Sequence, residues 1–191
     1  MIFQIWIGDK PEDRIKYMKS VIDISDSYIL FSNKNYFNKN KKIKWVDVNK
    51  VIHDLFLEYP ELETVYNNLS IENKSDLLRF YILSKFDNSM YVDTDVILNE
   101  IPLFEYVSVP YFSKYKNKNA DTYIIYNNNN KEFFINLLNF YKDKLKEEQL
   151  IRLNGDTKHI FWYLLQIYLK NSCYKLITNI NNFIHMDLID G

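Results

Sequence analysis

The sequence predicts an α/β fold in which a mainly parallel mixed sheet is flanked by helices. Short apolar runs rich in β-branched and aromatic residues alternate with segments whose apolar residues recur at helical spacing. Only three glycines and four prolines punctuate the chain, and no linker-like or repetitive segment divides it. We therefore expect residues 1–191 to form one domain, with ligands at the carboxyl ends of its strands.

The first half of the chain supplies most of the expected alternation. FQIWIG, residues 3–8, reads as a strand that is buried at once and then turns, because Gly-Asp-Lys-Pro closes it. Two roles are open for Trp6 near the end of this strand. Its indole either fills the hydrophobic core or offers a flat apolar surface on which a ligand ring can stack. The elements expected next are a helix at 11–24, strands at 27–32 and 43–48, helices at about 49–59 and 72–86, and a strand at 90–98.

The second half is less regular. Asp156 follows Asn154-Gly155 and is a candidate cap for the last helix, and the tail from residue 181 has no clear period. The expected elements are strands at 109–113 and 121–126, a turn at 127–130, and helices at 131–145 and about 156–169.

Composition narrows the classes of function. The formal charge of −1 gives no general attraction to nucleic acid or anionic lipid. The lysine cluster within 34–44 is interpreted as a solvated loop in preference to a binding site for a polyanion. A single cysteine, Cys173, excludes an intrachain disulfide and suits a reducing compartment. No segment approaches the roughly 20 apolar residues of a membrane span, and a signal-peptide pattern is lacking, so we expect a cytoplasmic protein.

The segment MYVDTDVIL contains the most informative pair of residues. Asp93 and Asp95 are two apart on the strand expected at 90–98, so both side chains should project from one face. Adjacent like charges repel, and their apolar neighbours imply partial burial, where unpaired carboxylates are costly. A divalent cation such as Mg²⁺ or Mn²⁺ would relieve both penalties. Alone, however, an Asp-x-Asp is common and usually lies on a solvated strand end or turn.

The helix that precedes this strand adds to the case. Asp76 and Arg79 are three apart, hence neighbours on one helix face. A surface ion pair is the plainer interpretation, worth a few tenths of a kcal/mol. The helix is otherwise very apolar and passes through the short turn Asp87-Asn88-Ser89 into the strand of Asp93. A guanidinium and a further carboxylate are therefore expected close to the candidate metal site.

FQIWIG, SDLLRFYIL and MYVDTDV, in this order and spacing, resemble the glycosyltransferases with a DxD-containing sugar-binding region. These are the capsular-polysaccharide and mannosyl-type enzymes and, more distantly, the glucosyltransferase domain of large clostridial toxins. The resemblance implies a GT-A fold, a UDP- or GDP-sugar donor, Mn²⁺ or Mg²⁺, and transfer with retention of configuration.

The resemblance also implies roles for single residues. Trp6, with Ile5 beside it, would bind the nucleotide, its indole stacking on the donor's base. Asp76 and Arg79 would hold the transferred sugar and the phosphate side of the donor. The residues given a catalytic role are Arg79, Asp93 and Asp95; Asp93 would reach the ribose, the sugar or the metal through water, and Asp95 would bind the metal more directly.

Several positions depart from the family pattern. Asn88-Ser89 stands where the family usually has a Gly pair, so a close approach of the backbone at this turn is in doubt. Phe3 stands where the polysaccharide enzymes often have His. His185 is the candidate for a further metal contact from the C-terminal part, although it equally suits a satisfied histidine in an irregular tail. The residues with a weaker case are Asp121 and Asp156 as acceptor-side acids, and His53 and His159, which read as structural or exposed.

The expected reaction is transfer of a sugar to an acceptor hydroxyl in synthesis of a capsule-like or lipopolysaccharide-like glycan. The same chemistry on a protein or on a modified base of phage DNA stays open, and the lysine-rich loop at 34–44 permits it. A sugar-binding module without turnover is the alternative from another class.

Overall fold

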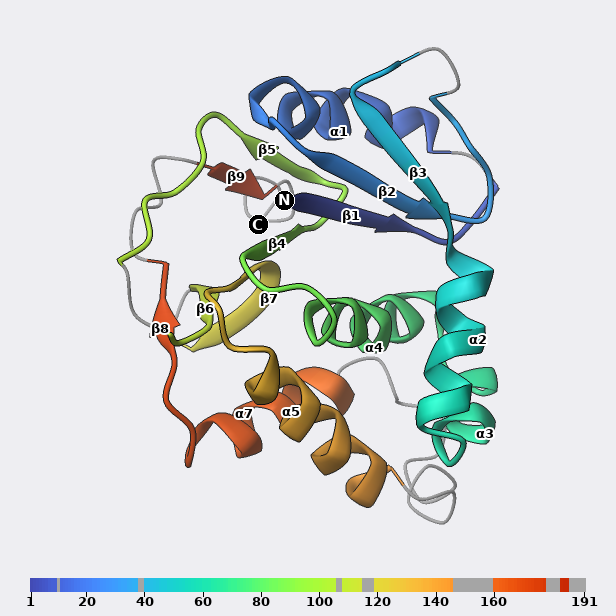
Figure 1. Cartoon of the computed structure of the whole chain (residues 1–191), viewed down its shortest axis with the longest axis vertical. Coiled ribbons are helices and arrows are strands. Elements are labelled where there is room, and N and C mark those ends of the chain that lie inside the picture. The colour runs from blue at the N-terminus through green and yellow to red at the C-terminus, as the bar shows by residue number, and fades with distance from the viewer. Residues whose placement is uncertain are drawn as a thin grey trace.

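A computed structural model describes residues 1–9, 11–37, 40–105, 108–114, 119–145, 160–177 and 183–185 (Figure 1). Its large sheet has seven strands in the order β3-β2-β1-β4-β7-β6-β8, and β5 and β9 form a second, small sheet. The strands are β1 Ile2–Trp6, β2 Tyr28–Ser32, β3 Ile43–Asp47, β4 Ser89–Val92, β5 Val96–Leu98, β6 Tyr111–Lys114, β7 Ala120–Asn127, β8 Lys175–Leu176 and β9 Phe183–His185. The helices are α1 Glu12–Ile24, α2 Val48–Glu58, α3 Leu62–Asn67, α4 Ile71–Leu83, α5 Lys131–Lys144 and α7 Ile160–Leu169.

Strand directions confirm the expected mainly parallel mixed sheet. β1 pairs in parallel with both β2 and β4, and β2 pairs in parallel with β3. β7 is antiparallel to β4 and to β6, and β8 runs parallel to β6. The chain leaves β1 through α1 to reach β2 on one side, whereas β4 joins β1 on the other. The strand order therefore reverses between β1 and β4, where a ligand crevice is expected at the carboxyl ends.

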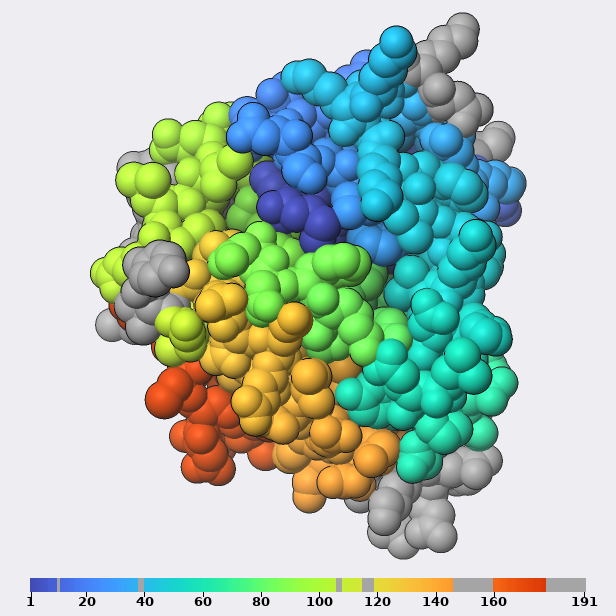
Figure 2. All heavy atoms as spheres, in the orientation of Figure 1, coloured from blue at the N-terminus to red at the C-terminus, as the bar shows by residue number. Residues whose placement is uncertain are grey.

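Helices cover both faces of the sheet. Phe3 and Ile5 of β1 face the larger core beneath α2, α4, α5 and α7, while Ile2 faces a smaller core shared with α1 and β5. This division follows from the period of two along a strand. Figure 1 shows α1 and β5 on one side of β1 and the other helices opposite, and in Figure 2 the atoms of α4 lie between those of α2 and α5.

Side-chain caps define where three of the helices begin. The Asp47 carboxylate accepts the amide N–H of Asn49 at 3.0 Å at the start of α2. The Ser70 hydroxyl, just before α4, accepts the amide N–H of Asn73 at 3.3 Å. Asn130 caps α5 in the same way. Each cap satisfies a donor that the first helical turn leaves without an intrahelical partner.

The single strand expected at 90–98 is wrong. β4 ends at Val92 and β5 begins at Val96, and a turn separates them in which the Val96 N–H donates to the Asp93 carbonyl at 3.3 Å. The chain turns here because β4 belongs to the large sheet, whereas β5 pairs with β9. The tail was expected to lack a period but contributes β9, and α3 and β8 were not predicted. Asp156, the candidate cap of the last helix, lies outside the described residues.

Asn88 explains how the chain does without the family's Gly pair. Its φ is 51°, in the left-handed region that glycine adopts freely. Asparagine tolerates this region better than other residues with a side chain. Ser89 then starts β4 with its hydroxyl donating to the Phe86 carbonyl at 2.7 Å. The tight turn from α4 into β4 is thus kept with different residues.

Surface features agree with the compositional reading. Lys34, Lys41, Lys42 and Lys44 are all exposed, and Lys34 pairs with Asp9 at 3.1 Å; Lys39 lies outside the described residues. Cys173 is free and exposed. Within the described ranges, no helix has the length and apolar character needed to cross a membrane.

Candidate active site

A pocket of about 410 Å³ lies where β1 and β4 end, at the reversal of strand order. It brings together every residue given a donor, catalytic or metal role from the sequence except His185. Its lining comprises Ile5, Trp6, Ile7, Arg14, Ile71, Glu72, Ser75, Asp76, Arg79, Tyr91, Asp93, Thr94, Asp95 and Thr122.

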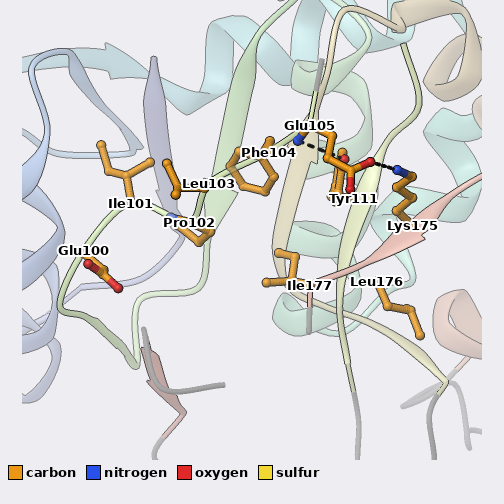
Figure 3. Close-up of a pocket in the computed structure, with 10 residues that line it drawn as sticks. All are labelled: Glu100, Ile101, Pro102, Leu103, Phe104, Glu105, Tyr111, Lys175, Leu176 and Ile177. Carbon is orange, nitrogen blue, oxygen red and sulfur yellow. Dashed lines mark hydrogen bonds and ion pairs between the residues drawn. The ribbon is translucent and has the colours of Figure 1, made fainter. Parts of the chain in front are cut away.

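A second pocket, of about 660 Å³, lies between the segment 100–105 and β8 (Figure 3). Tyr111 and Lys175 line it at the starts of β6 and β8, and an ion pair joins Lys175 to Glu105. Because β6 runs in the direction of β4, this pocket lies toward the opposite edge of the sheet from Asp93. Although larger, it contains none of the predicted site residues.

Arg79 is the centre of the charged cluster. One terminal nitrogen, Nη2, lies 2.9 Å from Asp76 Oδ1 and 3.2 Å from Asp93 Oδ1, and Nη1 donates to the Thr122 carbonyl at 2.7 Å. The guanidinium also lies over the Tyr91 ring, 4.3 Å from its centre. Only 5% of Arg79 is exposed. The plainer interpretation, an isolated surface ion pair, is therefore wrong, because α4 places this arginine under the turn after β4.

Burial sets the charges of this cluster. It raises the pKa of Asp76 to about 6, an effect that Arg79 opposes and that Asp93, Asp121 and Glu72 reinforce. Burial acts to lower the pKa of Arg79, but Asp93 and the other neighbouring acids outweigh it, and the net pKa lies above the ordinary value. Near pH 7, above this pKa, the guanidinium thus faces an ionised Asp76 carboxylate, and it also contacts the Asp93 side chain.

The raised pKa of Asp76 makes a pH-dependent contribution to stability. The folded chain binds this proton more tightly than the unfolded chain, so the stabilisation is complete below the ordinary carboxyl pKa and is lost as pH rises through about 6. As pH rises from about 4 to about 7, the free energy of unfolding of wild type should therefore fall by about 2 kcal/mol relative to that of Asp76→Asn, as measured by urea unfolding. Asp23→Asn, at an exposed carboxyl of α1, is the control and should track wild type. Parallel curves for wild type and Asp76→Asn would contradict the assignment.

The backbone of Asp93 is fixed from two sides. Its N–H donates to the Tyr123 carbonyl of β7 at 2.8 Å, and its carbonyl accepts from Gln4 Nε2 at 2.9 Å. Gln4 is fully buried, and its own Oε1 accepts the Tyr28 hydroxyl at 2.7 Å. Sequence reasoning missed Gln4, although an amide side chain inside an otherwise apolar strand was a usable signal.

The side chains of the two aspartates are held by different arginines. Asp93 contacts Arg79 and accepts the Tyr91 hydroxyl, whose pKa is raised by burial so that it keeps its proton. Asp95 Oδ2 instead lies 3.1 Å from Arg14 Nη1, in the first turn of α1. The turn after β4 replaces the expected placement on one face of a strand, and it lets each carboxylate find its own counter-charge. Arg14 was not predicted as a site residue.

Trp6 ends β1 at the edge of the pocket. Its indole packs against the smaller core, and a Cβ on Gly8 would lie 3.5 Å from the indole nitrogen. That nitrogen is shielded from solvent and has no hydrogen-bond partner among the described residues. Ile5, by contrast, is 4% exposed and belongs mainly to the core under α4. Trp6 therefore offers the pocket more surface than Ile5 does.

Histidines add little to the described site. β9 pairs with β5 so that His185 lies opposite Val96, directly after Asp95, but its side chain lies outside what the structure describes. His53 is on the surface near Asp54, and His159 lies outside the described residues. Asp121 on β7 accepts the N–H of Thr122. Within the described ranges no three His, Cys, Asp or Glu residues cluster as a ready metal site.

A comparison with known protein families identifies the region that contains the two aspartates. A sequence model described as "Glycosyltransferase sugar-binding region containing DXD motif" matches residues 11–105, a span that includes α1, α4 and both aspartates. The chain therefore contains a glycosyltransferase sugar-binding region of the DXD type. In this glycosyltransferase region the DXD motif is Asp93-Thr94-Asp95, and the pocket described above surrounds it. A search of curated proteins found no match.

Solved structures with the same fold are also transferases. PaToxG glycosyltransferase superposes with a TM-score of 0.63 at 14% identity, over 88% of this chain and 67% of that one. A mutant transferase gives 0.54 at 12% identity, over 96% and 92% of the two chains. The apo form of the glycosyltransferase GlyE from Streptococcus pneumoniae gives 0.56 at 13% identity, covering 93% of this chain and 45% of GlyE. The chain thus has the GT-A fold expected from its sequence, and it spans less than half the length of GlyE.

Proposed function

We propose that this domain, spanning residues 1–191, transfers a sugar from a UDP- or GDP-sugar donor to an acceptor hydroxyl, dependent on Mn²⁺ or Mg²⁺ and with retention of configuration. The observation that carries the proposal is the pocket at the carboxyl ends of β1 and β4, which gathers Trp6, Arg79 and both DXD aspartates. An aromatic face, a guanidinium and paired carboxylates in one crevice suit the base, diphosphate and sugar of such a donor.

The charges of the pocket fit a divalent cation. Four acids, Glu72, Asp76, Asp93 and Asp95, line it with two arginines, Arg14 and Arg79, so acidic side chains outnumber basic ones by two in the lining. Carboxylate oxygens are the ligands that Mg²⁺ and Mn²⁺ prefer, and both ions share them with substrate phosphates. Asp93 and Asp95 would hold the ion, with His185 as a further candidate ligand. When bound, the ion would stabilise negative charge on the departing diphosphate.

The protein's own side chains would orient the donor. Trp6 would stack on the base, with Ile5 next to it in the pocket lining, and the carboxylate of Asp76 would accept hydroxyls of the transferred sugar. Arg79 fixes the directions of Asp76 and Asp93 and adds positive charge on the phosphate side. The reaction breaks the bond between sugar C1 and phosphate, and the acceptor proton passes to the leaving phosphate. The acceptor we propose is a hydroxyl of a capsule-like or lipopolysaccharide-like glycan.

A thermal-shift panel of UDP- and GDP-sugars, with and without Mn²⁺, tests the proposal. A cognate donor raises the unfolding midpoint by mass action, and Mn²⁺ should increase that shift. Released sugar should then accompany the binding. A donor that binds saturably but is never cleaved would identify a binding module instead, and a panel without any shift would contradict the assignment.

Trp6 should contribute to donor affinity through stacking. Trp6→Ala should weaken binding of the cognate nucleotide-sugar about tenfold, because base–aromatic stacking is worth roughly 1–3 kcal/mol, and Trp6→Phe should retain part of it. Calorimetric titration measures the effect. Trp45→Phe is the matched control, since the Trp45 indole N–H is bound to Ser32 Oγ outside the pocket and its replacement should leave donor affinity unchanged. Equal affinities of wild type and Trp6→Ala would remove Trp6 from the donor site.

A further inference from the structure

The ion pair between Arg14 and Asp95 is held in place by the packing of α1. Met18 and Val21 bury this helix against the smaller core, and the Ser20 hydroxyl accepts the Leu98 N–H at 3.2 Å, joining α1 to β5. Asp95 directly precedes β5. The first turn of α1 therefore presents Arg14 to Asp95 with its guanidinium 3.1 Å from Oδ2.

The two arginines of the pocket differ in their freedom to move. The Arg79 side chain is 6% exposed and binds two carboxylates and a backbone carbonyl, so displacing it would open the core. The Arg14 side chain is 35% exposed, and Asp95 is its ion-pair partner within the part of the chain that the structure describes. Arg14 can thus leave Asp95 by rotating its side chain toward solvent.

A cation that binds Asp95 must compete with this guanidinium. Both bring positive charge to the same carboxylate, and like charges a few ångströms apart repel strongly in a half-buried site. The ion pair also occupies an oxygen that would coordinate the ion. Without metal, the guanidinium in turn lowers the cost of burying Asp95, whose side chain is 18% exposed.

We propose that Arg14 is a positioning residue that occupies Asp95 as a stand-in for the cation and is displaced when the cation binds. The inference rests on the proposed function, since it concerns the same DXD site. Arg14 thereby keeps the turn after β4 ordered in the metal-free chain, at the expense of metal affinity. Removing its charge should tighten metal binding, whereas a residue that supports the metal site would weaken binding when removed.

Calorimetric titration of Mn²⁺ alone, without donor, tests this on the full chain. Arg14→Gln should bind Mn²⁺ roughly three- to tenfold more tightly than wild type, a range set by partial solvent screening of the pair. Arg14→Lys keeps a cation at the single contacting nitrogen and should stay within about twofold of wild type. Lys16→Gln removes one positive charge from an exposed position of α1, and its Mn²⁺ affinity should also stay within about twofold of wild type.

A second readout separates this role from a merely structural one. Without metal, Arg14→Gln should lower the unfolding midpoint by about 1–2 °C, and saturating Mn²⁺ should abolish the difference. Unchanged or weaker Mn²⁺ binding by Arg14→Gln, with normal binding by wild type, would overturn the inference alone. Mn²⁺ binding by neither protein would overturn it together with the metal dependence of the proposed function.

Discussion

Replacing Arg79 by methionine is expected to destabilise the fold by about 3 kcal/mol, because it removes one partner of a buried ionic cluster. The carboxylates of Asp76 and Asp93, 21% and 24% exposed, would lose the guanidinium that faces them, and the Thr122 carbonyl would lose its donor. Urea unfolding followed by circular dichroism measures the loss. At low pH the loss should shrink as Asp76 takes up its proton.

Two comparisons test the cause of that loss. Arg14→Met removes a guanidinium that is 35% exposed and should cost less than about 1 kcal/mol. In an Asp76→Asn background, Arg79→Met should also cost less than in wild type, since one of the stranded charges is absent. Equal costs in both backgrounds would show that packing of the arginine stem, and not charge pairing, accounts for the effect.

Asp95→Asn is expected to reduce sugar release from the cognate donor by at least about a hundredfold, the size of effect typical for loss of a group that stabilises transition-state charge. Asparagine keeps the shape of the side chain but lacks the negative charge that a cation requires. The fold should survive, because Arg14 is exposed enough to be solvated when its partner is neutralised. A Mn²⁺ titration of donor cleavage measures the change.

The matched control for this substitution is Asp23→Asn, which alters an exposed aspartate of α1 in the same way. It should leave both cleavage and its dependence on Mn²⁺ at the wild-type level. If Asp95→Asn retained the Mn²⁺ response of wild type, the DXD motif of this chain would not be its metal site.

Local patterns predicted most of the fold. The alternation of apolar runs and helical spacing located β1 to β3, β6, β7, α1, α2, α4 and α5 to within a few residues, because each element buries a face of its own. The break between Val92 and Val96 was missed since the apolar run continues across it. Whether such a run stays in one sheet depends on pairing with β9, a contact over almost ninety residues that no local pattern contains.

In the candidate site, too, local patterns predicted some residues, and contacts between distant segments decided the others. Trp6, Asp76, Arg79, Asp93 and Asp95 were found because their spacing resembles a known family, and the pocket brings all five together. Their roles, the acceptor glycan and a cytoplasmic location stay predictions.

Two contributors to the site were missed. Gln4 reads as a minor irregularity in a strand, and Arg14 as one more charge on an amphipathic helix. Their importance comes from packing that aims one at the Asp93 carbonyl and the other at Asp95.

The pairing of β5 with β9 has a consequence for synthesis on the ribosome. Residues 183–185 supply the strand that lies beside β5, which follows Asp95 directly. A nascent chain that has already made the whole matched segment, 11–105, still lacks this neighbour for as long as residue 185 stays inside the exit tunnel. Within residues 1–191, the strand that directly follows the motif is thus among the last to gain its pairing partner.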